Sequence, residues 1–252
     1  MMIAVSIEQQ LQQRVAELES ELAQRTRDAA DKEQQLARYA ADLRETFKEE
    51  RSRSHELRQS YMLTVRALAS AVEARDAYTG RHAERVAAYG LKLASTFGLR
   101  LGDEPEIEFG FLLHDAGKVA VPDAILFKPG RLTHAERLII EQHPVTGSEI
   151  VRDIEFLGAA RDVIRHHHER WDGTGYPDRL AGDDIPISAR IFAVADTLDA
   201  LTTNRPYRRA STIAQARVII LQSVGTHFDP SVIEAFKELS DEQIERIRLE
   251  IG

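Results

Sequence analysis

The chain has 252 residues, 43% of them hydrophobic, with a net charge of -8 at pH 7 and no cysteine. The lack of thiols excludes disulfides, thiolate zinc sites and cysteine nucleophiles, so any metal must be held by His, Asp or Glu. The acidic balance argues against nucleic-acid binding, which needs broad basic surfaces. No apolar run approaches the roughly 18 residues that cross a bilayer, and the first residues lack the pattern of a signal peptide. We therefore expect a cytoplasmic protein without membrane contact.

The first predicted element is a long helix. Apolar side chains recur at alternating spacings of three and four residues from Leu11 to Leu43, in a background of Gln, Glu, Arg and Ala without Pro or Gly. This heptad pattern predicts a coiled coil, and we expect a parallel homodimer because a lone helix would leave the apolar seam in water. The pattern changes phase after Phe47, which predicts a stutter before a globular domain. We therefore divide the chain into residues 1–60 and 61–252.

The remainder of the chain predicts helices and loops without sustained strand alternation, so the predicted fold class is all-α. Caps, apolar spacing and breakers predict helices at 79–97, 109–118, from Thr133, from Pro144, up to His168, and at 187–203, 213–224, 230–238 and 241–249. The Gly- and Pro-rich segment 171–186 is too long for a simple connector, so we regard it as a candidate functional loop.

The pair His114 and Asp115 ends an apolar run and is followed by Lys118. On a continuous helix, adjacent side chains point about 100° apart, so both could reach one metal. Lys118 would lie on the same side as Asp115, three residues further on. A single pair of this kind is more often a helix end with solvated charges, so the interpretation depends on whether other ligands exist.

Seven of the nine histidines lie between His82 and His168. With neighbouring acids they can supply two metal centres, from His82, His114, Asp115, His143, His167, His168 and Asp196. Nitrogen and oxygen donors favour iron or manganese, with zinc possible. Two such metals could share a bridging hydroxide as nucleophile and neutralise charge on a phosphoryl group, and Asp115, with two oxygens, is the natural bridging ligand. His166 is left with a surface or supporting role.

Together these residues resemble the HD-GYP family, a branch of the HD phosphohydrolase superfamily, over about residues 68–236. The resemblance rests on ordered segments: Glu73-Ala74-Arg75-Asp76, Thr79-Gly80-Arg81-His82, His114-Asp115-Ala116-Gly117-Lys118, Val121-Pro122-Asp123, His143-Pro144, His167 to Pro177, Ala195-Asp196, Arg205-Pro206-Tyr207-Arg208 and Gly225 to Pro230. It implies an HD-domain helical bundle that hydrolyses cyclic di-GMP to linear pGpG or on to GMP at a metal site.

The resemblance also implies roles for individual residues. The metal ligands would be the seven residues named above. In members of the family with three metals, a Glu lies four residues before the first ligand His; here that residue is Tyr78, a poor ligand at neutral pH, so we expect two metals. Asp115 and Lys118 would be catalytic. Nucleotide and phosphate contacts would come from Lys118, Tyr176, Arg205 and Arg208, with Asp199 touching the ligand or orienting neighbouring groups.

Two alternatives remain open. The same chemistry could act on a different cyclic dinucleotide, or the domain could be a catalytically weak cyclic-dinucleotide sensor or protein-interaction module in which binding outlasts catalysis. The predicted coil adds a regulatory hypothesis, because a heptad helix that feeds into the domain could transmit rotation or a change of register from an upstream signalling partner.

Overall fold

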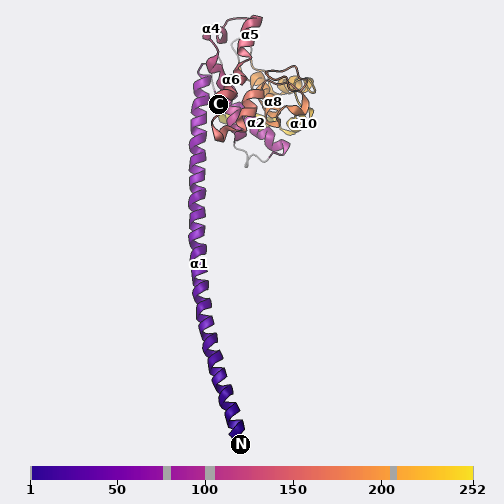
Figure 1. Ribbon diagram of the computed structural model, residues 1–252. Helices are drawn as coiled ribbons and strands as arrows, with labels where there is room; N and C mark the ends of the chain where they lie inside the picture. The colour runs from indigo at the N-terminus through magenta and orange to yellow at the C-terminus, as the bar shows by residue number, and fades with distance from the viewer. Residues whose placement is uncertain (1, 76–80, 100–105, 205–208, 252) are drawn as a thin grey trace. The chain divides into compact units, whose positions relative to one another are not determined.

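Figure 1 shows the computed structural model, in which the described residues are 2–75, 81–99, 106–204 and 209–251, without the side chains of 2–6 and 8. The chain divides into two compact units, Met1–Ser60 and Tyr61–Gly252. Across the described ranges the regular elements are helices, with one isolated bridge between Val224 and Phe228, so the all-α prediction is confirmed. No described helix combines the length and the apolar character that crossing a bilayer requires.

The first unit is part of helix α1 (Met2–Glu73), which runs without interruption through the expected change of phase. Its heptad seam is exposed in the single chain: Leu22 is 66% and Leu36 67% accessible. Exposed ion pairs within the helix, such as Arg25 with Glu21 at 2.8 Å, each contribute little stability. The long helix is confirmed, and dimerisation through the seam stays a prediction.

The second unit contains the last turns of α1 and all the remaining helices. These are α2 (His82–Phe97), α3 (Glu106–Leu113), η1 (Ala116–Ala120), α4 (Asp123–Leu126), α5 (His134–Ile140), α6 (His143–Ile150), η2 (Glu155–Leu157), α7 (Ala160–His166), η3 (Gly182–Asp184), α8 (Ile187–Thr202), α9 (Ile213–Gln222), α10 (Pro230–Glu238) and α11 (Asp241–Ile251). Helix α2 packs against α3, α8, α10 and α11, while α7 packs against α3, α6 and α8. Burial of Phe111, Phe192 and Phe236 between these helices provides the core.

Local capping signals fix several helix ends as expected. Thr133 forms a capping box with Glu136, and α10 occupies the predicted range behind the N-cap Asp229. Helix α2 stops at Gly98, whose φ of 100° permits the left-handed conformation that closes the helix. Thr79, the expected start of α2, lies outside the described residues, and the N-cap that the structure shows is Arg81.

The expected continuous helix over 109–118 is wrong. Helix α3 ends at Leu113 and the 3-10 helix η1 begins at Ala116, so His114 and Asp115 lie in the turn between them. The break brings the backbone of η1 against that of α6: a Cβ on Gly117 would lie 2.6 Å from the Gly147 nitrogen of α6 and would also collide with the backbone of His143. The break in the helix therefore accompanies a tertiary contact between η1 and α6.

Candidate metal centre

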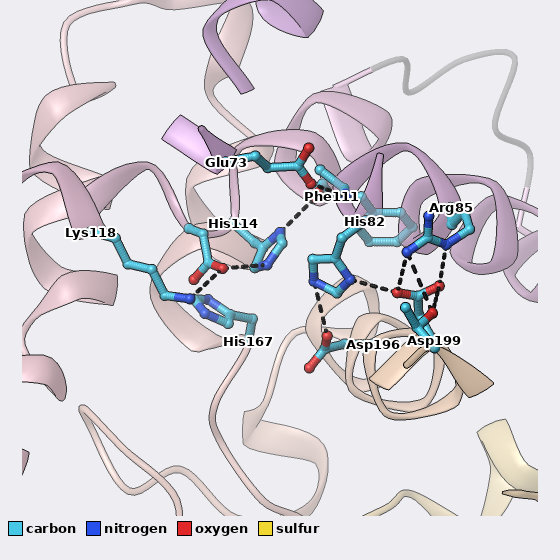
Figure 2. Close-up of polar contacts among 12 residues, drawn as sticks. Glu73, His82, Arg85, Phe111, His114, Lys118, His167, Asp196 and Asp199 are labelled. Carbon is cyan, nitrogen blue, oxygen red and sulfur yellow. Dashed lines mark hydrogen bonds and ion pairs between the residues drawn. The ribbon is translucent and has the colours of Figure 1, made fainter. Parts of the chain in front are cut away.

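Three predicted ligands form a first cluster, His82, His114 and Asp115, at the start of α2 and in the α3–η1 turn. Figure 2 labels the two histidines of this cluster. One ligand atom of each lies within 4.8 Å of those of the others. The His114 Nε2 is 3.1 Å from Asp115 Oδ2. Asp196, from α8, places its Oδ1 3.5 Å from the His82 Nε2. Three separate elements thus bring four of the predicted ligands together.

A second cluster consists of His143, His167 and His168, whose ligand atoms also lie within 4.8 Å of one another. His143 is the first residue of α6, and the other two follow the end of α7. The Nε2 atoms of His143 and His167 are 3.1 Å apart, and the rings of His167 and His168 have centroids 4.2 Å apart. Contact between α6 and α7 therefore assembles an all-imidazole cluster.

Asp115 lies between the two clusters. Its Oδ2 faces His114, whereas its Oδ1 is 3.3 Å from the Nε2 of His143. Lys118 places its Nζ 2.8 Å from the Oδ2. A carboxylate that presents one oxygen to each cluster is suited to bridging two metals, as the sequence led us to expect.

Hydrogen bonds from the ring nitrogen that faces away from the clusters orient most of the imidazoles. The Nδ1 atoms of His114, His143 and His167 contact the backbone carbonyls of Phe111, Ile140 and Ile164, three residues earlier in each case, at 2.9, 2.7 and 2.9 Å. A carbonyl only accepts, so each Nδ1 carries a proton, and in the neutral form of each ring the Nε2 is the nitrogen left to bind a metal. His82 instead contacts a side chain, with its Nδ1 2.7 Å from the Asp199 Oδ2.

The two clusters differ in charge. Burial raises the pKa of Asp115, but His114 and Lys118 outweigh it and hold that pKa well below its usual value. Burial lowers the pKa of His114, but Asp115 outweighs this and raises it. In the second cluster, burial and then the neighbouring imidazoles hold the pKa values of His167 and His168 well below the usual value. His167 and His168 are therefore held in the neutral form, the form that binds metals.

Of the expected substrate contacts, Lys118 and Tyr176 lie at the clusters. The Tyr176 ring stacks on His168 with centroids 4.7 Å apart. Asp199 is only 1% exposed and faces His82 and α2, which favours its orienting role over contact with a ligand. Arg205, Arg208 and Tyr78 lie outside the described residues, so these expectations stay predictions.

Two residues near the first cluster were given no role by the sequence. Arg85 donates from its Nε to the Asp199 Oδ1 at 2.6 Å. Glu73, at the end of α1, accepts a hydrogen bond from the backbone nitrogen of Ala83, next to His82 (Figure 2). The sequence contains one indication of a role for Arg85. Arg85 follows His82 by three residues, just as Asp199 follows Asp196 by three, so each pair lies on one face of its helix.

The other histidines of the segment lie apart from the clusters. His166 has its Nε2 3.1 Å from Asp178 Oδ2 and its Nδ1 3.0 Å from the carbonyl of Asp162, in agreement with a supporting role. His134 is exposed in the first turn of α5. The donors that do converge are imidazoles and carboxylates, a set that fits divalent metals of intermediate hardness.

Comparisons with known proteins agree with this geometry. A family model described as HD domain matches residues 6–232. The 3'3'-cGAMP-specific phosphodiesterase 2 of Vibrio cholerae is 43% identical over 81% of this chain and 37% of that protein. A probable cyclic di-GMP phosphodiesterase of the same organism is 37% identical over 79% of this chain and 52% of that protein. The chain thus spans between about a third and a half of the length of these curated relatives.

A solved structure shares the fold. The Bd1817 structure, a HDG"Y"P protein from Bdellovibrio bacteriovorus, superposes with a TM-score of 0.53 over 72% of this chain and 63% of that chain. Its sequence is 21% identical, so this likeness concerns the helical fold alone.

Proposed function

Because the chain belongs to the HD domain family, in its HD-GYP branch, we propose that it is a metal-dependent phosphodiesterase that hydrolyses cyclic di-GMP to linear pGpG or on to GMP. The observation that carries the proposal is Asp115, which presents one oxygen to each ligand cluster. The name of the probable cyclic di-GMP phosphodiesterase among the relatives supports the same reaction and substrate.

The donor set fits two divalent metals, most simply iron or manganese, with zinc as a further option. His82, His114 and Asp196 would hold one metal and His143, His167 and His168 the other, with Asp115 between them. When bound, such a pair supplies an activated water and neutralises charge on the scissile phosphate. The proposal of two metals, and not three, rests on Tyr78 in place of a carboxylate.

The chain's own residues then hold the substrate. Lys118, 2.8 Å from Asp115, places an ammonium at the edge of the clusters, where it can contact the phosphate or the leaving oxygen. Tyr176, stacked on His168, offers a ring and a hydroxyl to the nucleotide. Arg205 and Arg208 would grip phosphate through their guanidinium forks.

A second candidate substrate is 3'3'-cGAMP. The specific observation in its favour is the relative named for that dinucleotide, which is 43% identical to this chain. Both candidates place the same phosphodiester at the same metals, so the choice depends on base contacts and not on the ligand clusters. In the sensor alternative, the domain binds a cyclic dinucleotide at the same site but does not hydrolyse it.

The test is hydrolysis by the full chain, purified without air and loaded with iron or manganese. Cyclic di-GMP, 3'3'-cGAMP and cyclic di-AMP are each incubated with the protein, and products are identified by chromatography. We expect conversion of cyclic di-GMP to pGpG or GMP. Preferential cleavage of 3'3'-cGAMP would select the second candidate, binding of the nucleotide without turnover would select the sensor, and neither binding nor cleavage would refute the proposal.

We further propose that α1 forms a parallel coiled-coil homodimer with a second copy. Its apolar seam is exposed over several heptads, as shown by Leu22 and Leu36. The variant Leu22→Lys with Leu36→Lys should be monomeric by light scattering. Ala23→Lys with Ala37→Lys adds the same charge beside the seam and should leave the dimer intact. A monomeric wild-type chain would contradict the proposal.

The end of α1 also offers a route for regulation from an upstream partner. Within the second unit, Glu73 contacts the start of α2, and Arg75 donates to the carbonyl of Val119 at 2.7 Å and pairs with Asp123 at 2.6 Å. These contacts touch segments adjacent to His82 and Lys118. If α1 transmits a signal, deleting residues 1–60 should change both the oligomeric state and the rate; a dimer with an unchanged rate would argue against this role.

A further inference from the structure

His82 makes a contact between helices that three other imidazoles of the site do not show. His114, His143 and His167 each use the carbonyl three residues earlier. The residue three positions before His82, the first residue of α2, lies outside the described residues. The Nδ1 of His82 reaches across to α8, where the Asp199 carboxylate lies 2.7 Å away. The orientation of this imidazole therefore depends on how firmly Asp199 is held.

Arg85 holds Asp199. Its Nε lies 2.6 Å from Oδ1 and its Nη2 3.1 Å from Oδ2, so the guanidinium fork contacts both oxygens (Figure 2). Arg85 is 6% and Asp199 1% exposed, which leaves water little access to either group. Thr203 adds a longer contact, 3.4 Å from Oδ1. A buried carboxylate needs such paired donors, because an unpaired buried charge is strongly destabilising.

We propose that Arg85 is a positioning residue for the metal site, acting through Asp199 on His82. By fixing both oxygens, the guanidinium aims Oδ2 at the Nδ1–H of His82 and thereby turns the Nε2 toward Asp196, 3.5 Å away, and the first cluster. Arg85 follows His82 by one helical turn on α2, so the ion pair also ties the start of that helix to α8. This inference rests on the proposed role of His82 as a metal ligand.

The chain supplies a matched control in Arg190. This arginine is also largely enclosed, is also charge-paired with a buried aspartate, Asp229 at 2.8 Å, and also belongs to a long helix of the same unit. Asp229 contacts the N-terminus of α10, and the same guanidinium also pairs with the exposed Asp183 at 2.8 Å; neither aspartate is a predicted metal ligand. Arg190→Met therefore removes a comparable ion pair without touching the imidazoles.

The experiment measures manganese binding to the full chain without nucleotide, by titration with EPR detection of free ion. We expect wild type to bind two ions, and Arg85→Met to weaken one of the two sites by about 10- to 100-fold, the usual effect of removing an outer contact of a metal site. Arg85→Lys, which keeps the charge but loses the fork, should weaken it less. Arg190→Met should lower the unfolding temperature and leave both affinities unchanged.

Equal affinities in wild type and Arg85→Met would overturn the inference, as would an equal loss in Arg190→Met. If Arg85→Met fails to fold, the test uses Arg85→Lys. Unchanged manganese affinity at both sites of the folded lysine variant would overturn the positioning role of the Arg85 guanidinium, and a weakened affinity at one site would support that role. The readout separates the two proposals. A wild type that binds two ions but cleaves no cyclic dinucleotide loses the proposed function alone, whereas normal binding by the Arg85 variants overturns only the positioning role.

Discussion

The two ligand clusters offer similar donors to a metal but are built differently. In the second cluster, two imidazoles take their orientation from carbonyls three residues earlier, and all three are ring neighbours. In the first cluster, His82 depends on Asp199, which is 117 residues away. In the first cluster the mutual attraction of His114 and Asp115 raises the pKa of the imidazole and lowers that of the carboxyl, while in the second burial lowers the pKa values of His167 and His168. Local backbone carbonyls thus orient His143 and His167 and also His114 of the first cluster, whereas His82 is oriented by a long-range contact.

The largest effect should come from the residue common to both clusters. Asp115→Ala removes both bridging oxygens, so we expect loss of both metals and a fall in hydrolysis of more than about 100-fold, beyond the usual effect of outer contacts. His167→Ala should remove one metal and leave the other. Metal analysis of the purified proteins distinguishes the two results. Retention of two metals by Asp115→Ala would show that the clusters do not share this carboxylate.

A substitution between the clusters should have the next largest effect. Gly117→Ala forces a Cβ into the backbone of α6, 2.6 Å from the Gly147 nitrogen, and overpacking of this kind costs about 1–3 kcal/mol. Urea unfolding measures the loss of stability. Gly130→Ala is the comparison, because a Cβ there meets no neighbouring atom, although its φ of 121° adds strain of its own. If the free energy of unfolding of Gly117→Ala is no lower than that of Gly130→Ala, the backbone contact between η1 and α6 does not constrain the distance between the two ligand clusters.

Opposite charge states predict opposite pH dependence in the metal-free protein. The pKa of His167 is lowered from about 6.5, so its contribution to stability is present above that pH and is lost as pH falls through the folded pKa. The pKa of His114 is raised, so its contribution is present below about pH 6.5 and is lost as pH rises through the folded pKa. We plot the free energy of unfolding in urea against pH. His167→Asn should reduce the slope of this curve below about pH 6.5, and His114→Asn should reduce its slope above about pH 6.5. Identical changes of slope would contradict the contrast.

The smallest effect should come from the hydroxyl of Tyr176. Tyr176→Phe keeps the ring that stacks on His168 and removes one hydrogen-bonding group. We expect unchanged metal content and a rise in KM of about 2- to 10-fold, the equivalent of one ordinary hydrogen bond. Steady-state kinetics with cyclic di-GMP measures the change. An altered metal content would place Tyr176 in the second cluster itself and not on the substrate side.

Sequence reasoning succeeded where the cause is local. The heptads predict α1, the capping box predicts the start of α5, and the Asp229-Pro230 pair predicts the start of α10. It failed at the α3–η1 break, which accompanies a close backbone approach to a segment about 30 residues further along. Similarly, the motifs name the imidazoles and acids, but the role of Arg85 depends on a partner 114 residues away and on burial, neither of which a single sequence displays.

The contact between η1 and α6 has a consequence for the recognition of related chains. Gly117 and Gly147 lie so close that a Cβ on Gly147 would be 3.1 Å from the Gly117 nitrogen and 2.8 Å from a methyl of Ile164. Two backbones in contact have no rotamers with which to adjust, so the separation of the clusters is set by the absence of two side chains. A chain that retains every histidine and aspartate but replaces either glycine keeps the ligands and is expected to strain the contact between η1 and α6. This pair of glycines is thus a marker of an intact site that a search for ligands alone would overlook.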